Sequence, residues 1–275
     1  MNNPRVAING AAGRMGRQLL LALAEHPSCD LGAAVEHTGH ASVGSQVALL
    51  EPAYAERSDA THVAESLLPL VDLFDVCVDF TRPDATLAMV DALSGTNKSF
   101  VIGTTGFDAD GIARLEQAAK NHAVVFAPNY SVGVTLTLGL LEAAASSLGD
   151  DYDVEIIEAH HRNKVDAPSG TALRMGQAVA GALDRNLDDC AVYGREGITG
   201  VRDTKTIGFE TIRAGDIIGD HTVLFAGQGE RIEITHRATD RMTFARGAIR
   251  AAHWVSGQTP GLYDMADVIG LSTES

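Results

Sequence analysis

The segment Gly10–Gly16, GAAGRMG, constrains the fold of this chain more than any other part of its sequence. Its glycines have GxxGxxG spacing, follow a predicted strand at Arg5–Asn9 and open a predicted helix at Gly13–Glu25. Glycines at such a turn allow the backbone to approach a ligand closely, and the N-terminus of the helix then receives a pyrophosphate. No Lys-Ser/Thr pair follows Gly16, so the segment is not a P-loop. The pattern predicts dinucleotide binding.

A carboxylate at a suitable distance supports this interpretation. Glu36 lies 20 residues beyond Gly16, at the end of a predicted strand, Leu31–Val35. A carboxylate at this place can accept hydrogen bonds from ribose hydroxyls. The alternative is a structural glycine turn with an unrelated surface glutamate. The combination of strand, helix and acid favours the dinucleotide.

The first half of the chain alternates short apolar strands with helical patterns. Such alternation predicts an α/β fold with a Rossmann-like, doubly wound parallel sheet. Beyond the elements already named, we expect strands at Asp75–Phe80, Ser99–Ile102 and Ala123–Ala127, and helices that begin near Pro83 and Asp108.

The pattern changes after residue 130. A long apolar helix is expected at Val132–Leu148, a strand at Tyr152–Glu158 and a helix at Ser169–Leu183. The segment Thr204–Ala238 is rich in strands with no helices between them, which favours antiparallel pairing. A helical pattern returns at Phe244–Trp254. We therefore expect a second, α+β domain with a mixed or antiparallel sheet at residues 131–240, inserted into a dinucleotide-binding domain formed by residues 1–130 and 241–275.

Composition excludes several classes of function. The chain has 275 residues and a net charge of −15, so its bulk field repels nucleic acids and anionic membranes. No apolar run of membrane-spanning length and no secretory segment is expected. The three cysteines are widely spaced and form no CxxC or Cys/His pattern, so we expect neither disulfides nor a metal site, and a cytoplasmic location.

Three predicted loops lie at the carboxyl ends of parallel strands, the edge at which open α/β sheets bind ligands. They are Asp79–Pro83, Gly103–Gly106 and Ala127–Tyr130. On position alone, each is as compatible with an ordinary turn as with a binding loop.

The stretch EAHHRNKVDAPSGTAL, residues 158–173, concentrates cations in an otherwise acidic chain. Imidazole suits proton transfer near neutrality, and a lysine can bind a carboxylate or donate a proton. The helix expected to start near Ser169 offers free backbone N–H groups and its dipole to an anion. Together these groups suit a small molecule with more than one carboxylate that needs a proton.

Plainer interpretations of this stretch remain open. Paired histidines are often surface or capping residues, and a Lys–Asp pair is often solvated. A metal site lacks an HExxH or His-x-His pattern, and Ser169 lacks the GxSxG context of a nucleophile.

Several segments taken together resemble the 4-hydroxy-tetrahydrodipicolinate reductase (dihydrodipicolinate reductase) family of lysine biosynthesis. They are VAINGAAGRMGRQL, DFTRP, VIGTTGF, NYSVGV, IIEAHHRNKVDAPSGTAL and TIRAGDIIGDHTVLFAG, in the expected order from about residue 5 to residue 269. The EAHHRxKxDAPSGTA motif is the most specific of them.

The resemblance implies a two-domain enzyme that reduces a cyclic dicarboxylate to tetrahydrodipicolinate with NADH or NADPH. It also implies a homotetramer assembled through sheets of the second domain. His160 would be the acid/base residue, Lys164 the other proton donor, and His161, Gly170 and Thr171 would contact the substrate. The implied cofactor contacts are Gly10, Ala11, Ala12, Gly13, Arg14, Met15, Glu36, His37, Gly103, Thr104, Thr105, Ala127, Pro128, Asn129 and Tyr130.

One position departs from the family pattern. An arginine that can pair with the 2′-phosphate of NADPH often follows the acidic residue, and here that position is His37. An ordinary histidine is mostly neutral at pH 7. A strong preference for NADPH is therefore not expected, although Arg14 in the glycine turn offers another cation.

Two competing functions remain to be distinguished. The first is another nicotinamide-dependent dehydrogenase of a small carboxylate, such as an aspartate-semialdehyde or homoserine type. Acylation by a semialdehyde dehydrogenase requires a nucleophilic cysteine, and none is expected beside a histidine. The second is a dinucleotide-sensing protein without catalysis, which would bind the cofactor but would not need His160 and Lys164.

Overall fold

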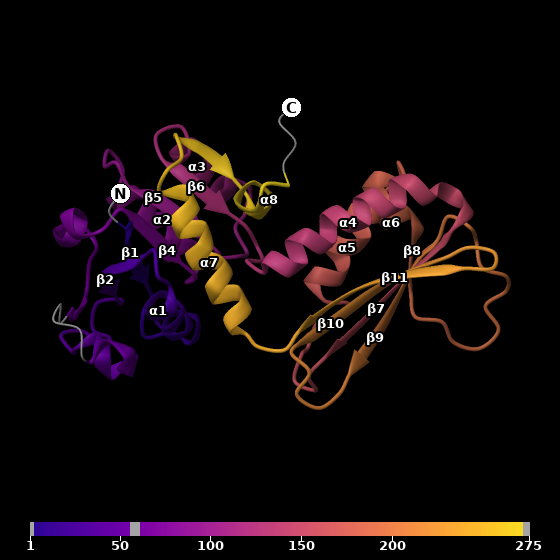
Figure 1. Ribbon diagram of the computed structural model, residues 1–275, viewed down its shortest axis with the longest axis horizontal. Coiled ribbons are helices and arrows are strands. Elements are labelled where there is room, and N and C mark those ends of the chain that lie inside the picture. The colour runs from indigo at the N-terminus through magenta and orange to yellow at the C-terminus, as the bar shows by residue number, and fades with distance from the viewer. Residues whose placement is uncertain (1–2, 56–60, 272–275) are drawn as a thin grey trace. The chain divides into compact units, whose positions relative to one another are not determined.

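The computed structural model describes residues 3–55 and 61–271. The chain separates into two compact units, Met1–Val132 with Met242–Ser275, and Gly133–Arg241 (Figure 1). The second unit is therefore an insertion in the sequence of the first.

The first unit is built on a seven-stranded sheet in the order β12-β6-β5-β4-β1-β2-β3, and all its pairs are parallel. The order reverses between β1 and β4, the switch point at which doubly wound sheets bind dinucleotides. The fold class predicted from the alternating pattern is confirmed. The strands are β1 Arg5–Asn9, β2 Asp30–Val35, β3 Val63–Ala64, β4 Val76–Asp79, β5 Ser99–Ile102, β6 Ala123–Phe126 and β12 Gly261–Tyr263.

Helices cover both faces of this sheet because its central strands are apolar on both sides. One core cluster joins the sheet to the helices α1 (Arg14–Glu25), α7 (Met242–Val255) and α8 (Met265–Ile269). A second cluster joins the opposite face to α2 (Pro83–Ala92) and α3 (Ala109–Ala118). Short 3-10 turns lie at Val47–Leu49, Pro52–Tyr54 and Leu68–Leu73.

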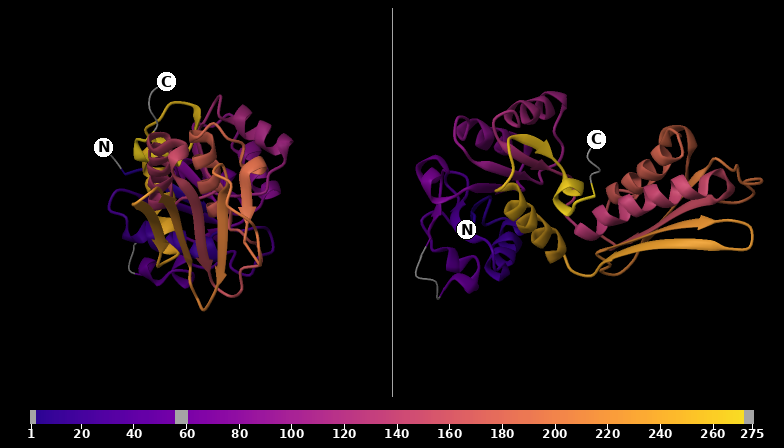
Figure 2. Two further views of the ribbon diagram at one scale, coloured as in Figure 1. Left: turned by 90° about the vertical axis from the view of Figure 1, so that its right-hand side faces the viewer. Right: turned by 45° about the horizontal axis from the view of Figure 1, so that its top comes forward.

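The second unit has a five-stranded mixed sheet in the order β11-β10-β7-β9-β8. Its helices lie on one face of the sheet, and the described chain leaves the other face uncovered (Figure 2). The elements are α4 Val132–Leu148, a 3-10 turn at Gly149–Asp151, β7 Asp153–His160, α5 Gly170–Ala182, α6 Leu187–Cys190, β8 Ala191–Tyr193, β9 Ile207–Arg213, β10 Gly219–Ala226 and β11 Arg231–Ala238.

The pairing in this unit differs in part from the expected antiparallel arrangement. β10 pairs antiparallel with both β11 and β7, but β9 pairs in parallel with β7, with Val154 opposite Ile207 and His160 opposite Arg213. The strand β7 lies between β9 and β10, so these two strands, which follow one another in sequence, are not neighbours. β7 also extends to His160, which places this histidine at the end of the strand instead of in the following loop.

The expectation that the chain contains no membrane span stays a prediction, because one helical segment passes the test of length and composition alone. Val132–Asp151 has a mean hydropathy of 1.4 over its most apolar 18 residues. By length and composition alone, this segment is therefore long and apolar enough to cross a membrane. Its inward residues Leu141 and Ala145 pack in the core of the second unit, whereas Leu136 and Leu140 are exposed.

Replacing Gly16 with alanine should lower both the melting temperature and the affinity for NADH. A Cβ atom at Gly16 would lie 2.1 Å from the carbonyl oxygen of Gly10 and 2.6 Å from that of Ala11, both backbone atoms. Such crowding typically costs about 1–3 kcal/mol. Thermal unfolding and NADH titration measure the two effects.

Gly181→Ala is the matched control, because no atom lies within 4 Å of a Cβ built at this position in α5. It should keep or slightly raise the melting temperature, since alanine favours a helix over glycine. Wild-type stability and NADH affinity in the Gly16 variant would contradict the role given to this turn.

Candidate active site

The glycine turn leads directly from β1 into α1. Gly10 has φ +75°, a conformation that L side chains rarely adopt. Its N–H and that of Ala11 donate to the carbonyl oxygen of Val35, both at 3.0 Å, which fixes the turn against the end of β2. The N-cap residue Gly13 provides no side-chain cap, so the first turn of α1 is available to an anion.

Glu36 closes this turn from the neighbouring strand. One carboxylate oxygen accepts a hydrogen bond from the backbone N–H of Ala12 at 2.9 Å, and the other accepts from the N–H of His37 at 3.3 Å. The side chain is largely buried. Each carboxylate oxygen has two lone pairs, so both can still accept from a ligand hydroxyl.

Two histidines lie beside Glu36. The rings of His37 and His40 are 5.2 Å apart, and Nδ1 of His37 is 3.0 Å from the carbonyl oxygen of Thr38. A carbonyl only accepts, so this Nδ1 carries the hydrogen and Nε2 of neutral His37 has the free lone pair. Ligand atoms of Glu36, His37 and His40 lie within 4.8 Å of one another, a spacing that could hold a metal ion. The expected absence of a metal therefore stays a prediction.

A buried carboxylate holds together the elements at the ligand-binding edge of the sheet. The sequence analysis gave this carboxylate no role. Asp79, with 0% exposure, accepts hydrogen bonds from Asn9 at 2.5 Å, from the Thr81 backbone at 3.1 Å, and from the hydroxyls of Thr86 and Thr104 at 2.7 Å each. These donors come from the ends of three strands and from α2. The Thr104 side chain thus faces inward, which leaves only its backbone to meet a cofactor.

Among the other expected cofactor residues, some are exposed and others have side chains in the core. Thr105 and Pro128 are exposed, and a Cβ at Gly103 would lie 2.1 Å from the Phe80 ring, so glycine is required there. The Tyr130 side chain is 1% exposed and donates its hydroxyl to the carbonyl oxygens of Ile102 and Val125, both at 3.0 Å. Its side chain is therefore part of the core, whereas the sequence analysis placed the residue among the cofactor contacts.

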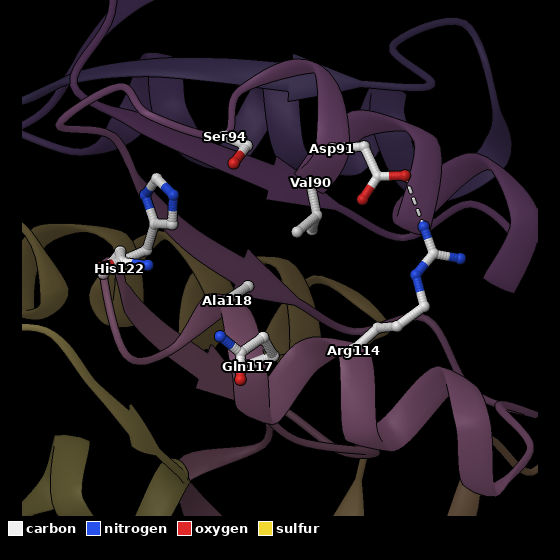
Figure 3. Close-up of a pocket in the computed structure, with 8 residues that line it drawn as sticks. Val90, Asp91, Ser94, Arg114, Gln117, Ala118 and His122 are labelled. Carbon is white, nitrogen blue, oxygen red and sulfur yellow. Dashed lines mark hydrogen bonds and ion pairs between the residues drawn. The ribbon is translucent and has the colours of Figure 1, made fainter.

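A pocket elsewhere in this unit is separate from these loops. It has an empty volume of about 560 Å³ and lies between α2 and α3, where Arg114 pairs with Asp91 (Figure 3). His122, which lines it, immediately precedes β6. The pocket is therefore at the amino ends of the strands, the edge opposite the glycine turn.

The cationic stretch begins at a buried acid–base pair in the second unit. Nδ1 of His160 is 2.6 Å from Oε2 of Glu158, and both side chains are buried. Arg213 of the adjacent strand β9 donates to both oxygens of Glu158 at 2.8 Å. The backbone N–H of Ser169 donates to Oε1 at 3.1 Å. The pair thus joins β7, β9 and the start of α5.

Lys164 lies in the turn after β7. Its ammonium is 2.8 Å from Oδ2 of Asp166, and its side chain is 21% exposed. Arg213 donates to the backbone carbonyl oxygen of Asp166 at 2.6 Å. The same arginine that holds Glu158 therefore also fixes the turn that carries Lys164.

His161 adds a buried group without a partner among the described residues. Its Nε2 is 3.5 Å from Nη2 of Arg241, a guanidinium that can only donate, so Nδ1 carries the hydrogen. That Nδ1 is buried and has no hydrogen-bond partner. An unpaired buried N–H is costly, which makes it suited to receive an anion.

The start of α5 is held by a second histidine. Ser169 caps the helix by accepting from the N–H of Ala172 at 3.1 Å, and its hydroxyl oxygen is 2.8 Å from Nε2 of buried His221. Gly170 and Thr171 are the first helical residues of α5. Sequence reasoning missed Glu158, Arg213, His221 and Arg241 as parts of this site.

Burial sets the protonation of these imidazoles. It lowers the pKa of His160 below its usual value, although the Glu158 carboxylate opposes this effect. Burial, with a contribution from His160, lowers the pKa of His221 to about 4. Burial alone would raise the pKa of the Glu158 carboxyl, but Arg213 and His160 hold it below its usual value. A neutral His160 beside an ionised Glu158 follows.

The cysteines do not provide a nucleophile for acyl transfer. Burial raises the pKa of Cys29 to about 12 and that of Cys77 well above its usual value, and it also raises the pKa of Cys190. Since the thiolate is the reactive form, all three are poorly suited to attack a carbonyl. This disfavours the semialdehyde dehydrogenase alternative.

The first unit has a doubly wound sheet with an uncapped glycine turn, and the same chain carries a cationic acid–base site. This combination is typical of nucleotide-dependent oxidoreductases. Comparison with known proteins gives the family. The models for the N-terminal and C-terminal parts of dihydrodipicolinate reductase match residues 4–130 and 133–269. The chain belongs to the dihydrodipicolinate reductase family, whose members are NAD(P)H-dependent oxidoreductases.

Individual relatives agree with this assignment. The 4-hydroxy-tetrahydrodipicolinate reductases of Hahella chejuensis and Alkalilimnicola ehrlichii are 57% and 58% identical over 267 residues, which cover 97% of this chain and 99% of each relative. A dipicolinate-bound dihydrodipicolinate reductase from Paenisporosarcina sp. TG-14 superposes with a TM-score of 0.77 at 26% identity, covering 97% of this chain and 99% of that one. A diaminopimelate dehydrogenase from C. glutamicum, at 13% identity and a TM-score of 0.54, shares the fold alone.

His37→Arg should raise kcat/KM for NADPH relative to NADH at pH 8. A guanidinium beside Glu36 carries a permanent charge and can donate two parallel hydrogen bonds to the 2′-phosphate, and imidazole lacks this fork of donors. His37→Gln is the control and should leave the cofactor ratio at pH 8 near that of the wild type. Steady-state kinetics with both cofactors measure the ratio. A wild-type preference for NADPH of more than about tenfold, or about 1.4 kcal/mol, would show that another cation reads the phosphate.

Proposed function

We propose that this chain reduces 4-hydroxy-tetrahydrodipicolinate to tetrahydrodipicolinate with NADH or NADPH, in diaminopimelate and lysine biosynthesis. The first unit binds the dinucleotide on the Gly10–Gly16 turn, with Glu36 accepting from a ribose. The second unit binds the cyclic dicarboxylate on the segment from His160 to Thr171. The observation that carries the proposal is the buried His160–Glu158 pair at the point where this segment begins.

The reduced nicotinamide supplies a hydride when bound, and the residues of the second unit orient the substrate and supply a proton. Loss of the 4-hydroxyl as water makes the ring conjugated, and hydride addition to this ring then places negative charge on the ring-nitrogen side, so a nearby acid lowers the barrier. Lys164 and His160 are the proposed proton donors. The substrate's carboxylates would favour the charged form of His160, since an adjacent anion raises the pKa of an imidazole. Substrate binding would thereby prepare the acid.

His161 and the start of α5 would bind the two carboxylates. His161 Nδ1 is a buried donor, and the first turn of α5 begins with the backbone N–H of Gly170. A helix N-terminus stabilises an anion through these N–H groups and the helix dipole. Two separate donor groups suit a ligand with two carboxylates.

We also propose a homotetramer that forms through the sheet of the second unit. The uncovered face of this sheet exposes two isoleucines, Ile157 of β7 at 37% and Ile212 of the adjacent strand β9 at 49%. Burial of such residues drives association in water. Light scattering measures the assembly. A cytoplasmic location is proposed from the free cysteines and the biosynthetic role.

Lys164→Ala and His160→Gln should each reduce turnover strongly while NADH affinity stays nearly unchanged. General acid–base catalysis is typically worth about 10²–10⁴-fold. The assay follows NADH oxidation with enzymatically generated 4-hydroxy-tetrahydrodipicolinate, and NADH titration gives the affinity. Near-normal turnover in both variants would remove the assigned roles. A wild-type chain that binds NADH but does not turn over this substrate would favour the sensing protein.

Pyridine-2,6-dicarboxylate should compete with the substrate, because it presents both carboxylates on a planar ring without a reducible centre. Pyridine-2-carboxylate, with the same ring and one carboxylate, is the control and should inhibit much more weakly. Inhibition constants measured against varied substrate test the difference. Equal inhibition by the two compounds would argue against a site for two carboxylates.

A further inference from the structure

His160 is held by a buried carboxylate, Glu158, to which the proposed function gives no separate role. Glu158 has 1% exposure and lies two residues before His160 on β7, so both side chains are on the same face of the strand. The carboxylate accepts hydrogen bonds from Arg213, His160 and Ser169, and Thr211 lies at 3.3 Å from Oε1. A buried carboxylate of this kind is stable only with its lone pairs satisfied.

Geometry determines which nitrogen of His160 carries the hydrogen. A carboxylate bound at both oxygens by a guanidinium is ionised and can only accept. Nδ1 of His160, at 2.6 Å from Oε2, must therefore be the donor. In the neutral ring this leaves Nε2 with a free lone pair.

The surroundings of Nε2 keep it uncovered. A Cβ atom built at Gly219 of β10 would lie 3.0 Å from Nε2 of His160, so a side chain at this position would crowd the atom. The glycine does not have a positive φ and is not needed for a turn. His221 contributes the edge of its ring, with the ring centroids 5.0 Å apart.

We infer that Glu158 and Arg213 are positioning residues that orient His160, fixing its proton on Nδ1 and presenting Nε2 to the substrate. The inference rests on the proposed function, because it makes Nε2 the atom that exchanges a proton during reduction. Arg213 acts by holding Glu158 from β9, and Glu158 acts by holding the ring. Neither residue needs to touch the substrate.

Charged and titratable groups from every surrounding element set the sign of the pH effect. They are Glu158 on β7, Arg213 on β9, His221 on β10, and Lys164 and Asp166 in the turn. Glu158 raises the pKa of His160, whereas burial, Lys164 and Arg213 lower it. Removing the charge of Glu158 should therefore lower the pKa of His160 further, so that the ring loses its proton at more acidic pH.

The chain provides a matched control on the same strand. Glu155 also accepts two hydrogen bonds from one arginine, Arg195, at 2.9 and 2.7 Å, and a third from Arg202 at 2.9 Å. These donors are both arginines, and no histidine of the described chain is among them. Glu155→Gln therefore removes a similar ion pair without acting on the acid–base ring.

The test compares wild type, Glu158→Gln and Glu155→Gln by kinetics and by ¹⁵N NMR of histidine-labelled protein, with His160→Gln to assign the resonance. In the wild type, the neutral His160 ring should carry its hydrogen on Nδ1. Glu158→Gln should lose about 10²-fold or more in kcat, the lower range of acid–base effects, with little change in the KM for NADH. The pH profile limb of His160 should move to lower pH. Glu155→Gln should show none of these changes.

Three results would overturn the inference. The first is a wild-type neutral His160 with its hydrogen on Nε2, a measurement that needs neither variant to fold. The second is a Glu158 variant with an unchanged kcat and pH profile, and the third is an equal loss of kcat in both variants. Absence of turnover in a wild type that has the expected tautomer would instead count against the proposed function, because the NMR measurement does not depend on activity.

Discussion

The carboxylate of Glu158 is buried away from water and needs several hydrogen-bond donors, and this requirement organises the second unit. Glu158 is almost completely excluded from solvent, and an ionised group at such a place is stable only with several close donors. These donors come from β7, from β9 and from the first residues of α5. The parallel alignment of β9 with β7, which places Arg213 opposite His160, is what brings the guanidinium to the carboxylate. Strand pairing, helix start and histidine orientation thus meet at one side chain.

The first unit uses the same principle with neutral donors. Asp79 accepts from an amide and from hydroxyls instead of from an arginine, and these donors come from the end of β1, from α2 and from the loop after β5. Hydroxyl donors can rotate to suit the acceptor, so they hold loops together without adding positive charge. The uncapped start of α1 therefore remains the main anion-binding feature of this edge.

Sequence reasoning succeeded where the determining residues are close together in the chain. The glycine turn, Glu36 and the alternating strands depend on local spacing, and this predicted the parallel sheet correctly. It failed where the neighbours of a residue are determined by pairing between strands that are far apart in the sequence. Arg213 follows Glu158 by 55 residues, and only the register of β7 and β9 makes them neighbours. The side chains of Thr104 and Tyr130 turn into the core, because a loop position alone does not fix side-chain direction, and a cofactor contact through the backbone of these residues stays a prediction.

The order of elements along the chain has a consequence for synthesis on the ribosome. The second unit is continuous in sequence and contains its own core, so it can fold as soon as it has emerged. The first unit begins earlier but lacks one wall of its core until α7 supplies Ala245, Ala248, Ile249 and Ala252, all at 0% exposure. Its edge strand β12 comes later still. The first unit is thus begun first and completed last. Until α7 has been made, the apolar face of its sheet is exposed and must be protected from aggregation.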